Sequence, residues 1–285
     1  MTATDSSPTA THRRLPRISR AHIPLIVGAI IMVLPLIYMI SVSLTPADHV
    51  FDADAGLLPK DPTIASYLDA FARLDLGRGF VNSLVIAVPV TVGAVITSSM
   101  AGFAFARLEF VGRTLWFLAI LMTIMVPVQV RLIAEYIGFS YVGLLDTYWP
   151  LILPAALNSA FGVFLMRQYF LSLPREMDEA AELDGANPWQ FFWQIVLPQA
   201  KAPMGALALF TFLASWNDFF APLIFLTSDS LFTLPLRMAS TAGLYGTEWA
   251  LLMAAACVAI LPSLIAFILL RKYIVAGVSF TGAGK

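Results

Sequence analysis

An acidic side chain inside a strongly apolar segment is the feature of this sequence that could most readily do chemistry. Asp218 follows Trp216 and Asn217 between the apolar runs LFTFLAS and FFAPLIFL. An ionisable group at membrane depth is costly unless it is paired or hydrated, so we expect Asp218 to face a cavity or a partner. A place on a solute pathway and an interhelical hydrogen bond both remain open for it. For Trp216, packing is favoured over stacking against a sugar.

Further polar groups interrupt two other apolar segments. Gln129 and Arg131 lie near the end of one such segment, and Asn158 lies within the next. We take Gln129 and Asn158, together with residues 216–218, as candidates for lining a pathway. Arg131 and Glu135 are four residues apart and can pair on one helix face.

The sequence holds no arrangement typical of an enzyme. It has no paired general acid and base and no cluster of His and Cys, and its single cysteine, Cys257, lies in an apolar run. One cysteine cannot form a disulfide within the chain. The ending 282–285, GAGK, lacks the upstream glycine, the following Ser or Thr and the helix of a phosphate-binding loop. We therefore expect no catalytic residue, metal site or cofactor in this chain.

Much of the charge is gathered in one polar segment, residues 172–203, between two long apolar runs. Because charged side chains are costly in lipid, this segment must lie in water. Pro174 suits the first turn of a helix and Gly185 the position just past its end, which predicts a helix over 174–184. Its acidic side chains share one face, and the other face is small and apolar, made of Leu173, Met177, Ala180 and Ala181.

A second short helix is predicted over 188–197. Asn187 is placed to cap it, with Pro188 in the first position and Gln190 positioned to complete a capping box. Pro198 is expected to end it. Amphipathic segments that lie on lipid headgroups usually carry Lys and Arg, whereas the polar face of the first helix is acidic, so the segment is predicted to contact a protein.

The polar segment resembles the EAA loop of permease subunits of ABC importers. In that family the loop forms a coupling helix that docks into a groove on a cytoplasmic ATPase subunit. The resemblance implies that the glutamate makes polar contacts at the groove, that the alanines permit close approach and that the glycine makes the turn. The matching positions keep the spacing of the motif, which makes it specific. They are Glu179, Ala180, Ala181, Gly185, Ile195, Leu197 and Pro198.

Membrane spans must position these residues. The chain has 285 residues, of which 59% are hydrophobic, against about 45–50% in soluble domains. Its net charge of −1 gives no basic field for nucleic acid. We predict an all-α integral membrane protein, a six-span transmembrane helical bundle with a cytoplasmic coupling-helix loop. The permease domain covers 23–271, with spans at about 23–44, 81–106, 114–134, 147–169, 204–227 and 249–270, each long enough for a ~30 Å core.

The positions of Lys and Arg predict the orientation. With the N-terminus inside, the inner segments hold twelve of the 17 Lys and Arg residues and the outer segments hold five, as the positive-inside rule requires. The tails at 1–22 and 272–285 and the segment 172–203 are therefore predicted to be cytoplasmic.

The first outer loop, residues 45–80, is acidic. Ile64, Tyr67, Leu68, Phe71 and Leu74 recur in it at helical spacing and predict a short amphipathic helix on the outer surface. A plain surface helix and a seat for an external binding protein both fit this pattern.

The starts and interiors of the spans carry their own signals. Asn82 and Ser83 are expected to cap the second span. Each span also contains a proline, which bends a helix by removing a backbone hydrogen bond.

A wider resemblance covers nearly the whole chain from about residue 23. VPVQVRLI, GLLDTYWPLIL, FLMRQYF, SWNDFFAPL, TLPL and the ending RKYIVAGVSFTGAGK are similar to carbohydrate-type permeases, most of all to the second, G-type subunit of maltose-like systems. The ending departs from the usual Gly-Ala-Val-Lys-Gly. The resemblance implies a bacterial or archaeal cytoplasmic membrane, a homologous F-type permease, two ATPase subunits that bind ATP and Mg, and an extracytoplasmic substrate-binding protein. Membrane lipid is the other expected partner, and nucleic acid is not.

Two other classes of membrane protein fit the sequence less well. A secondary transporter driven by an ion gradient often shows inverted repeats and paired intramembrane charges, and neither is clear here. An integral-membrane enzyme needs several titratable groups at one membrane face, and the intramembrane charge is sparse. Sugars, oligosaccharides, polyols and glycerol phosphates all remain open as substrates.

Overall fold

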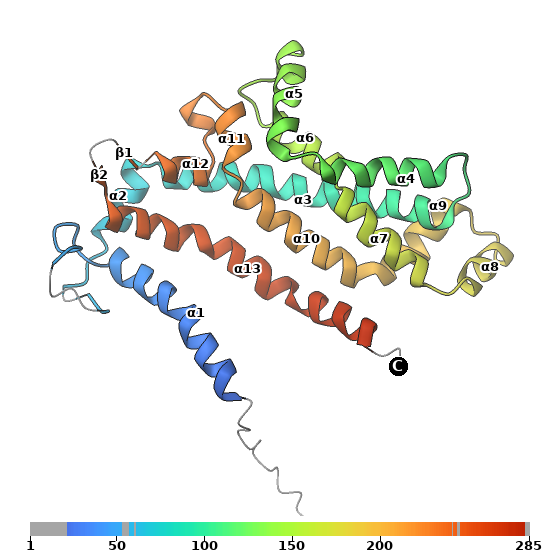
Figure 1. Ribbon diagram of the computed structural model, residues 1–285, viewed down its shortest axis with the longest axis horizontal. Coiled ribbons are helices and arrows are strands. Elements are labelled where there is room, and N and C mark those ends of the chain that lie inside the picture. The colour runs from blue at the N-terminus through green and yellow to red at the C-terminus, as the bar shows by residue number, and fades with distance from the viewer. Residues whose placement is uncertain (1–21, 53–56, 60, 241, 244–245, 283–285) are drawn as a thin grey trace, which may run out of the picture.

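The computed structural model describes residues 22–52, 57–59, 61–240, 242–243 and 246–282. It is helical almost throughout, and one long helix, α3 (Leu76–Arg107), forms its axis. Figure 1 shows α10 (Lys201–Trp216) running alongside α3, with α7 (Ala160–Ser172) crossing it and α13 (Trp249–Gly282) on the far side of α10. The helix α1 (His22–Ser43) packs on α13. The predicted all-α bundle is thereby confirmed.

The described residues contain five helices long and apolar enough to span a membrane, and a bent pair could make a sixth. The helices α1 and α3 cover the first two predicted spans. The sixth continues past residue 270, because α13 runs to Gly282 and takes in most of the stretch predicted as a C-terminal tail. The N-terminal tail, apart from His22, lies outside the described residues.

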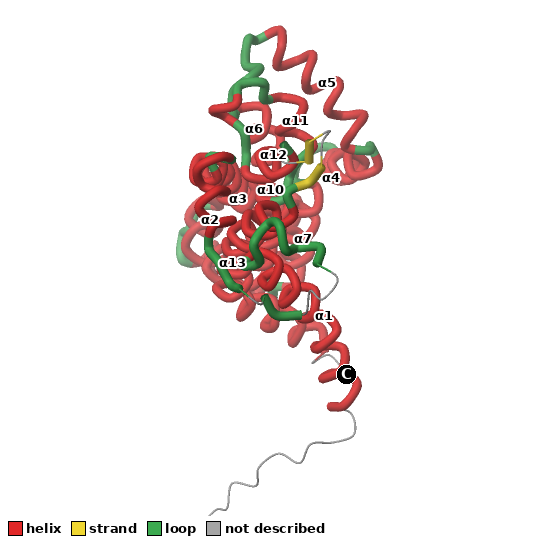
Figure 2. The backbone as a smooth tube through the Cα atoms, turned by 90° about the vertical axis from the view of Figure 1, so that its left-hand side faces the viewer, coloured by secondary structure: helices red, strands yellow, loops and turns green. Residues whose placement is uncertain are grey.

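The predicted third span, 114–134, is not one helix. The helix α4 (Arg113–Met122) and the 3₁₀ turn η1 (Thr123–Met125) are followed by a break, after which α5 (Val128–Tyr141) turns away by 104°. Val126 is extended, as the residue before a proline tends to be, and Pro127 has no N–H to continue the helix. In Figures 1 and 2, α5 projects from the bundle.

Two more predicted spans are interrupted. The fourth consists of α6 (Trp149–Leu157) and α7, separated by Asn158 and Ser159, and the Ser159 hydroxyl caps α7 by accepting from the Gly162 N–H at 3.1 Å. The fifth consists of α10 and the short α11 (Phe220–Phe225). Irregular backbone at membrane depth is tolerated where protein or a cavity surrounds it.

Small elements gather at one end of the bundle. Figure 1 shows α2 (Ala65–Arg73), α12 (Leu234–Ala239) and the strands β1 (Ala242–Gly243) and β2 (Gly246–Thr247) at the end opposite α8 (Glu176–Leu183). The two strands pair antiparallel. The 3₁₀ turn η4 (Asp229–Leu231) precedes α12.

At this end α3 begins at Leu76, so Asn82 and Ser83 are not its caps, contrary to expectation. Both are buried, and they hold the chain before α12 instead. The Asn82 amide donates to the carbonyl oxygens of Ser230 and Phe232, each at 3.0 Å. The Ser83 hydroxyl accepts from the Leu234 N–H at 2.9 Å. The groups that sequence analysis assigned to a helix start therefore join two distant segments.

The amphipathic helix predicted within residues 45–80 is confirmed as α2, but much of its apolar stripe is exposed. Leu68 and Phe71 are 62% and 51% exposed, whereas Ser66 and Ala70 are buried. The Tyr67 hydroxyl lies 2.8 Å from the Ser43 hydroxyl at the end of α1. This helix is held by its small and polar side, which leaves the larger apolar side chains free.

Candidate functional site

The polar segment begins with the predicted helix, α8, which starts two residues later than expected. Its first turn holds Glu176, Asp178 and Glu179, and carboxylates are favourable there because they meet the positive end of the helix dipole. Gly185 follows the helix with φ +76°, a left-handed conformation that glycine adopts without strain. The turn predicted at this glycine is confirmed.

The capping box is confirmed as well. The Asn187 side-chain oxygen accepts from the Gln190 N–H at 2.9 Å, and the Gln190 side-chain oxygen accepts from the Asn187 N–H at 3.0 Å. This fixes the start of α9 (Pro188–Gln190) directly after the turn.

Pro198 does not end the second helix, contrary to expectation. The chain passes from α9 into a π-helical turn, η2 (Phe191–Val196), then a 3₁₀ turn, η3 (Leu197–Ala200), and on into α10 without a break. Pro198 lies in the first positions of η3, where a π-helical turn passes into a 3₁₀ turn. The polar segment is thus joined rigidly to the fifth span.

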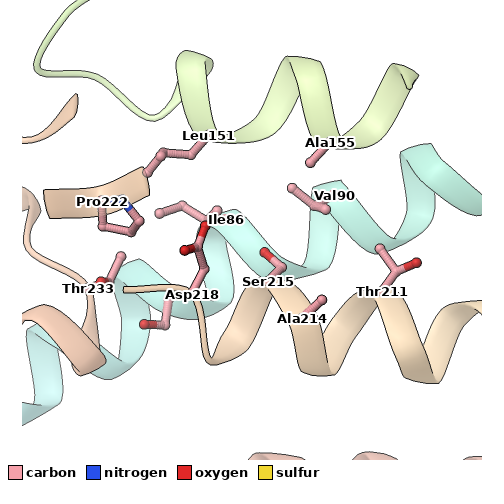
Figure 3. Close-up of a pocket in the computed structure, with 11 residues that line it drawn as sticks. Ile86, Val90, Leu151, Ala155, Thr211, Ala214, Ser215, Asp218, Pro222 and Thr233 are labelled. Atoms are coloured by element: carbon pink, nitrogen blue, oxygen red, sulfur yellow. The ribbon is translucent and has the colours of Figure 1, made fainter. Parts of the chain in front are cut away.

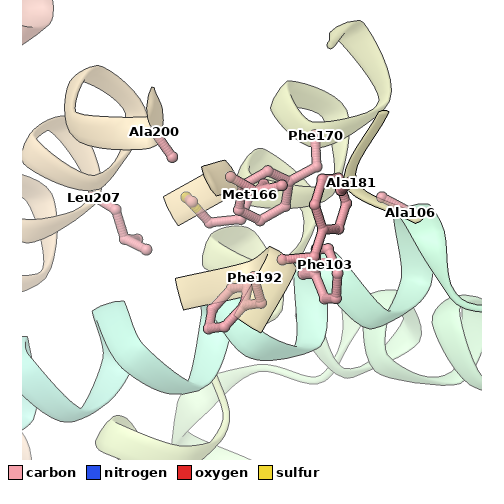
Figure 4. Packing of buried hydrophobic residues seen from close by; sticks show 10 residues of the cluster. Phe103, Ala106, Met166, Phe170, Ala181, Phe192, Ala200 and Leu207 are labelled. Atoms are coloured by element: carbon pink, nitrogen blue, oxygen red, sulfur yellow. The ribbon is translucent and has the colours of Figure 1, made fainter. Parts of the chain in front are cut away.

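The two alanines of the motif face different ways. Ala181 is 5% exposed and packs in a core cluster with Phe103, Phe170 and Phe192, as Figure 4 shows. Ala180 and Glu179 are exposed. The expectation that both alanines face a partner is therefore corrected, because Ala181 is buried in the core of this chain.

Beyond the alanines, the exposed surface of α8 ends in an apolar side chain. Leu183 is 89% exposed. The other motif positions lie on the connection to α10: Ile195 and Leu197 are half-buried against the same core cluster, and Pro198 is exposed. The outward surface of the segment is thus acidic at Glu179, small at Ala180 and apolar at Leu183.

An arginine that sequence reasoning missed secures α8. Arg107, the last residue of α3, forms an ion pair with Asp178. It also donates to main-chain carbonyl oxygens at the end of α7, those of Phe170 at 2.7 Å and Leu173 at 2.7 Å. The only signal in the sequence was a cation at the end of a predicted span, and the partner of this cation is 71 residues away.

Asp218 lies at the break between α10 and α11. Its side-chain oxygen accepts from the main-chain N–H groups of Phe220 at 3.1 Å and Ala221 at 3.3 Å. Asp218 therefore caps the start of α11. The sequence had suggested a solute pathway or an interhelical hydrogen bond for Asp218, and capping is a third role.

The same carboxylate lines a cavity of about 170 Å³ between α3, α6, α10 and α11. Figure 3 shows Asp218, Ser215, Thr211 and Thr233 among the residues around it. The Thr233 hydroxyl oxygen is buried and has no hydrogen-bond partner among the described residues. A small polar solute group or water could hydrogen-bond to these oxygens.

The remaining pathway candidates are not brought to this cavity. Trp216 is 2% exposed, stacks on Phe212 with ring centroids 5.9 Å apart, and donates its indole N–H to the Ala259 carbonyl at 3.0 Å. These contacts favour packing, as the sequence suggested. Asn217 is exposed and donates to the Leu213 carbonyl at 2.8 Å.

Gln129 and Asn158 lie elsewhere on the surface. Gln129 is exposed on α5, and Asn158 is exposed at the break between α6 and α7. The predicted pairing of Arg131 with Glu135 is confirmed at 2.9 Å. Within the part of the chain that the structure describes, no three His, Cys, Asp or Glu side chains come together in a way that could hold a metal ion.

Comparison with known proteins agrees with this architecture. The family described as binding-protein-dependent transport system inner membrane component matches residues 93–279. The chain is 33% identical to the arabinooligosaccharides transport system permease protein AraQ of Halalkalibacterium halodurans, over 89% of this chain and 92% of that one. It is also 33% identical to the sn-glycerol-3-phosphate transport system permease protein UgpE of Brucella melitensis, over 90% and 94%.

A solved structure has the same fold. It is a bacterial ABC transporter involved in the import of the acidic polysaccharide alginate, which matches with a TM-score of 0.77 and 23% identity over 91% of this chain and 100% of that one.

Proposed function

Because the chain belongs to the family of binding-protein-dependent transport system inner membrane components, we propose that it forms half of the pore of an ATP-driven importer for a polyhydroxylated solute. The chain itself is a multi-pass membrane permease. In this proposal it pairs with a homologous F-type permease, receives solute from an extracytoplasmic binding protein, and is driven by two ATPase subunits that bind ATP and Mg. Both of its termini and the segment 172–203 then face the cytoplasm.

The outward surface of α8 is the observation that carries the proposal. Glu179, Ala180 and Leu183 are exposed on a helix that is fixed from behind by Ala181 and Arg107. A small side chain allows close approach of a partner backbone, and an exposed leucine beside it can fill an apolar pocket. Such a surface suits a groove on a cytoplasmic ATPase.

The connection from α8 to the spans supports coupled movement. The chain runs from Asn187 to Trp216 in helical turns without a loop, so a displacement of α8 and α9 would move α10 with them. Closure of the ATPase dimer would then tilt the spans as rigid bodies and alternate access to a central pathway.

The arm formed by α5 supports a second permease as partner. It projects from the bundle, as Figure 2 shows, and Ile133, Ile137 and Tyr141 on it are exposed. A helix with such an exposed apolar surface fits the membrane-buried face of a homologous subunit. We place the F-type partner there.

The named relatives indicate the substrate class. One is named for arabinooligosaccharides and another for sn-glycerol-3-phosphate, and both kinds of solute carry more than one hydroxyl group. The cavity beside Asp218 offers a carboxylate and the hydroxyls of Ser215, Thr211 and Thr233, which are suitable partners for solute hydroxyls. We propose that this cavity belongs to the solute pathway.

The coupling role can be tested at Gly185. A Cβ added there would meet nothing within 4 Å in this chain, so a larger side chain would add backbone strain at φ +76° and would clash with a docked partner. In complexes reconstituted into proteoliposomes, Gly185→Asp should abolish solute uptake while insertion and basal ATP hydrolysis persist. Gly143→Asp is the matched control, because Gly143 has φ +68° and equally open surroundings but lies far from α8 in the sequence.

Equal uptake in the two variants would refute the coupling role. Uptake by energised vesicles that contain no ATP would favour the ion-gradient transporter instead.

A further inference from the structure

The end of α3 meets the end of α7 and the start of α8 at one guanidinium group. Arg107 ends α3, and its side chain is 8% exposed. It donates to the Phe170 carbonyl at 3.1 and 2.7 Å from two of its nitrogens, and to the Leu173 carbonyl at 2.7 Å. It also forms the ion pair with Asp178 in the first turn of α8.

The chemistry of each partner suits arginine. The last carbonyl groups of a helix have no partner within the helix, and they carry the negative end of its dipole. A guanidinium group is planar and always charged, and it presents five N–H groups in a fixed arrangement, so it can bind carbonyls and a carboxylate at once. A lysine could not hold the same three acceptors with one rigid group.

Few other contacts hold α8 to the spans. Its buried residue is Ala181, which packs on Phe103 and Phe170. Its other acidic residues, Glu176, Glu179 and Glu182, have no hydrogen bond or ion pair from their side chains among the described residues. Apart from a weak hydrogen bond from the Gln199 side-chain amide to the Met177 sulfur at 3.9 Å, the side-chain polar attachment of α8 described by the structure depends on Asp178 and Arg107.

We propose that Arg107 is a positioning residue that transmits the displacement of α8 directly to α3 and α7. This inference rests on the proposed role of α8 as the element that the ATPase moves. Without the ion pair, α8 would be joined to α7 only through the short turn at 173–175 and a small apolar contact. With it, the central helix of the bundle moves together with α8, although the two are far apart in the sequence.

The test uses Asp178→Asn in the full reconstituted complex. This change leaves the bonds from Arg107 to the α7 carbonyls in place and removes only the charge that holds α8. We expect assembly with the ATPase and basal ATP hydrolysis to persist, while the solute transported per ATP hydrolysed falls by roughly tenfold, the effect of losing one charge-assisted bond. Glu182→Gln on the same helix is the matched control and should leave this ratio unchanged.

A second measurement separates coupling from stability. A spin label at Glu182→Cys, in a Cys257→Ala background, should become more mobile when Asp178→Asn is added. Asp178→Glu should restore part of the transport ratio, because it restores the charge. These outcomes together support the inference.

The inference is overturned if Asp178→Asn and Glu182→Gln give the same transport ratio while Gly185→Asp still uncouples. If Gly185→Asp also leaves uptake intact, the coupling role of α8 itself is wrong. The two failures are thus distinguishable.

Discussion

The Thr97 hydroxyl on α3 donates to the main-chain carbonyl oxygen of Ala156, 2.7 Å away, one residue before α6 ends. The break at Asn158 and Ser159 interrupts the ladder that would otherwise satisfy this carbonyl. A carbonyl without a partner is expensive in the membrane, so a neighbouring hydroxyl takes over the role of the missing helical N–H. The broken fourth segment is thereby tied to the central helix at its weakest point.

Replacing this hydroxyl should destabilise the bundle. Thr97→Val keeps the shape and removes the donor, and we expect a loss of about 1 kcal/mol in the free energy of unfolding. Thr97→Ser retains the donor and should lose less. Reversible unfolding in mixed micelles measures both, and equal stability of the two variants would contradict the assigned bond.

The contact between α3 and α7 should not tolerate a methyl group. A Cβ on Gly102 would lie 2.6 Å from the Met166 Cβ and 2.8 Å from the main-chain nitrogen of Arg167. Gly102→Ala should therefore cost about 1–3 kcal/mol, because the two helices must separate. Gly138→Ala is the control, since its surroundings are open, and alanine in a helix should be neutral or stabilising. Thermal unfolding of the purified variants tests the difference.

Because of Asp146, the free energy of unfolding should depend measurably on pH in the acid range. Hydrogen bonds from the Ser228 hydroxyl and N–H and from the Thr227 N–H lower the pKa of Asp146 from 3.8 to about 2. The ionised Asp146 carboxylate therefore stabilises the folded state fully above about pH 4, and this stabilisation is lost as the pH falls through about 2. Asp146→Asn should be less stable than the parent at neutral pH, and the difference should disappear near pH 2.

Ser228→Ala removes the first of those donors and should reproduce part of this effect. A stability difference between the parent and Asp146→Asn that stays constant over the acid range would exclude the assigned hydrogen bonds.

The charge of Asp218 can be tested separately from its capping role. Asp218→Asn keeps a side-chain oxygen for the N–H groups of Phe220 and Ala221 but removes the negative charge from the cavity. If the cavity serves the pathway, uptake should fall several-fold at unchanged stability and basal ATP hydrolysis. Asp218→Ala should in addition destabilise α11 by about 1 kcal/mol, the usual cost of losing a cap. Normal transport by Asp218→Asn would remove the cavity from the pathway.

Local signals in the sequence predicted local structure well. The capping box of Asn187 and Gln190 and the turn at Gly185 depend only on neighbouring residues, and both are present. The prolines show the limit of this reasoning. Pro35, Pro89 and Pro262 lie inside continuous helices, whereas a break of 104° occurs at Pro127. The sequence marks every proline alike, and tertiary packing decides which of them ends a helix.

Contacts between distant segments were beyond the reach of the sequence. The pairing of Arg107 with Asp178 depends on where α3 ends and α8 begins in space, which the spacing of residues in the sequence does not encode. Ala180 and Ala181 are neighbours in the motif, and only the position of the aromatic cluster around Phe103 determines which one is buried. The sequence predicts Asn82 and Ser83 as caps because polar groups before an apolar run usually are, but their partners come from residues 230–234.

The central position of α3 has a consequence for how the protein is made. The main partners of α3, which are α7 and α10, follow it in the chain. During translation α3 is therefore synthesised before either of them. Until then the close-packing surface around Thr97 and Gly102 meets only lipid or the insertion machinery. The axis of the finished bundle is thus one of its earliest helices to enter the bilayer, and its packing is completed only after the fifth span has been synthesised.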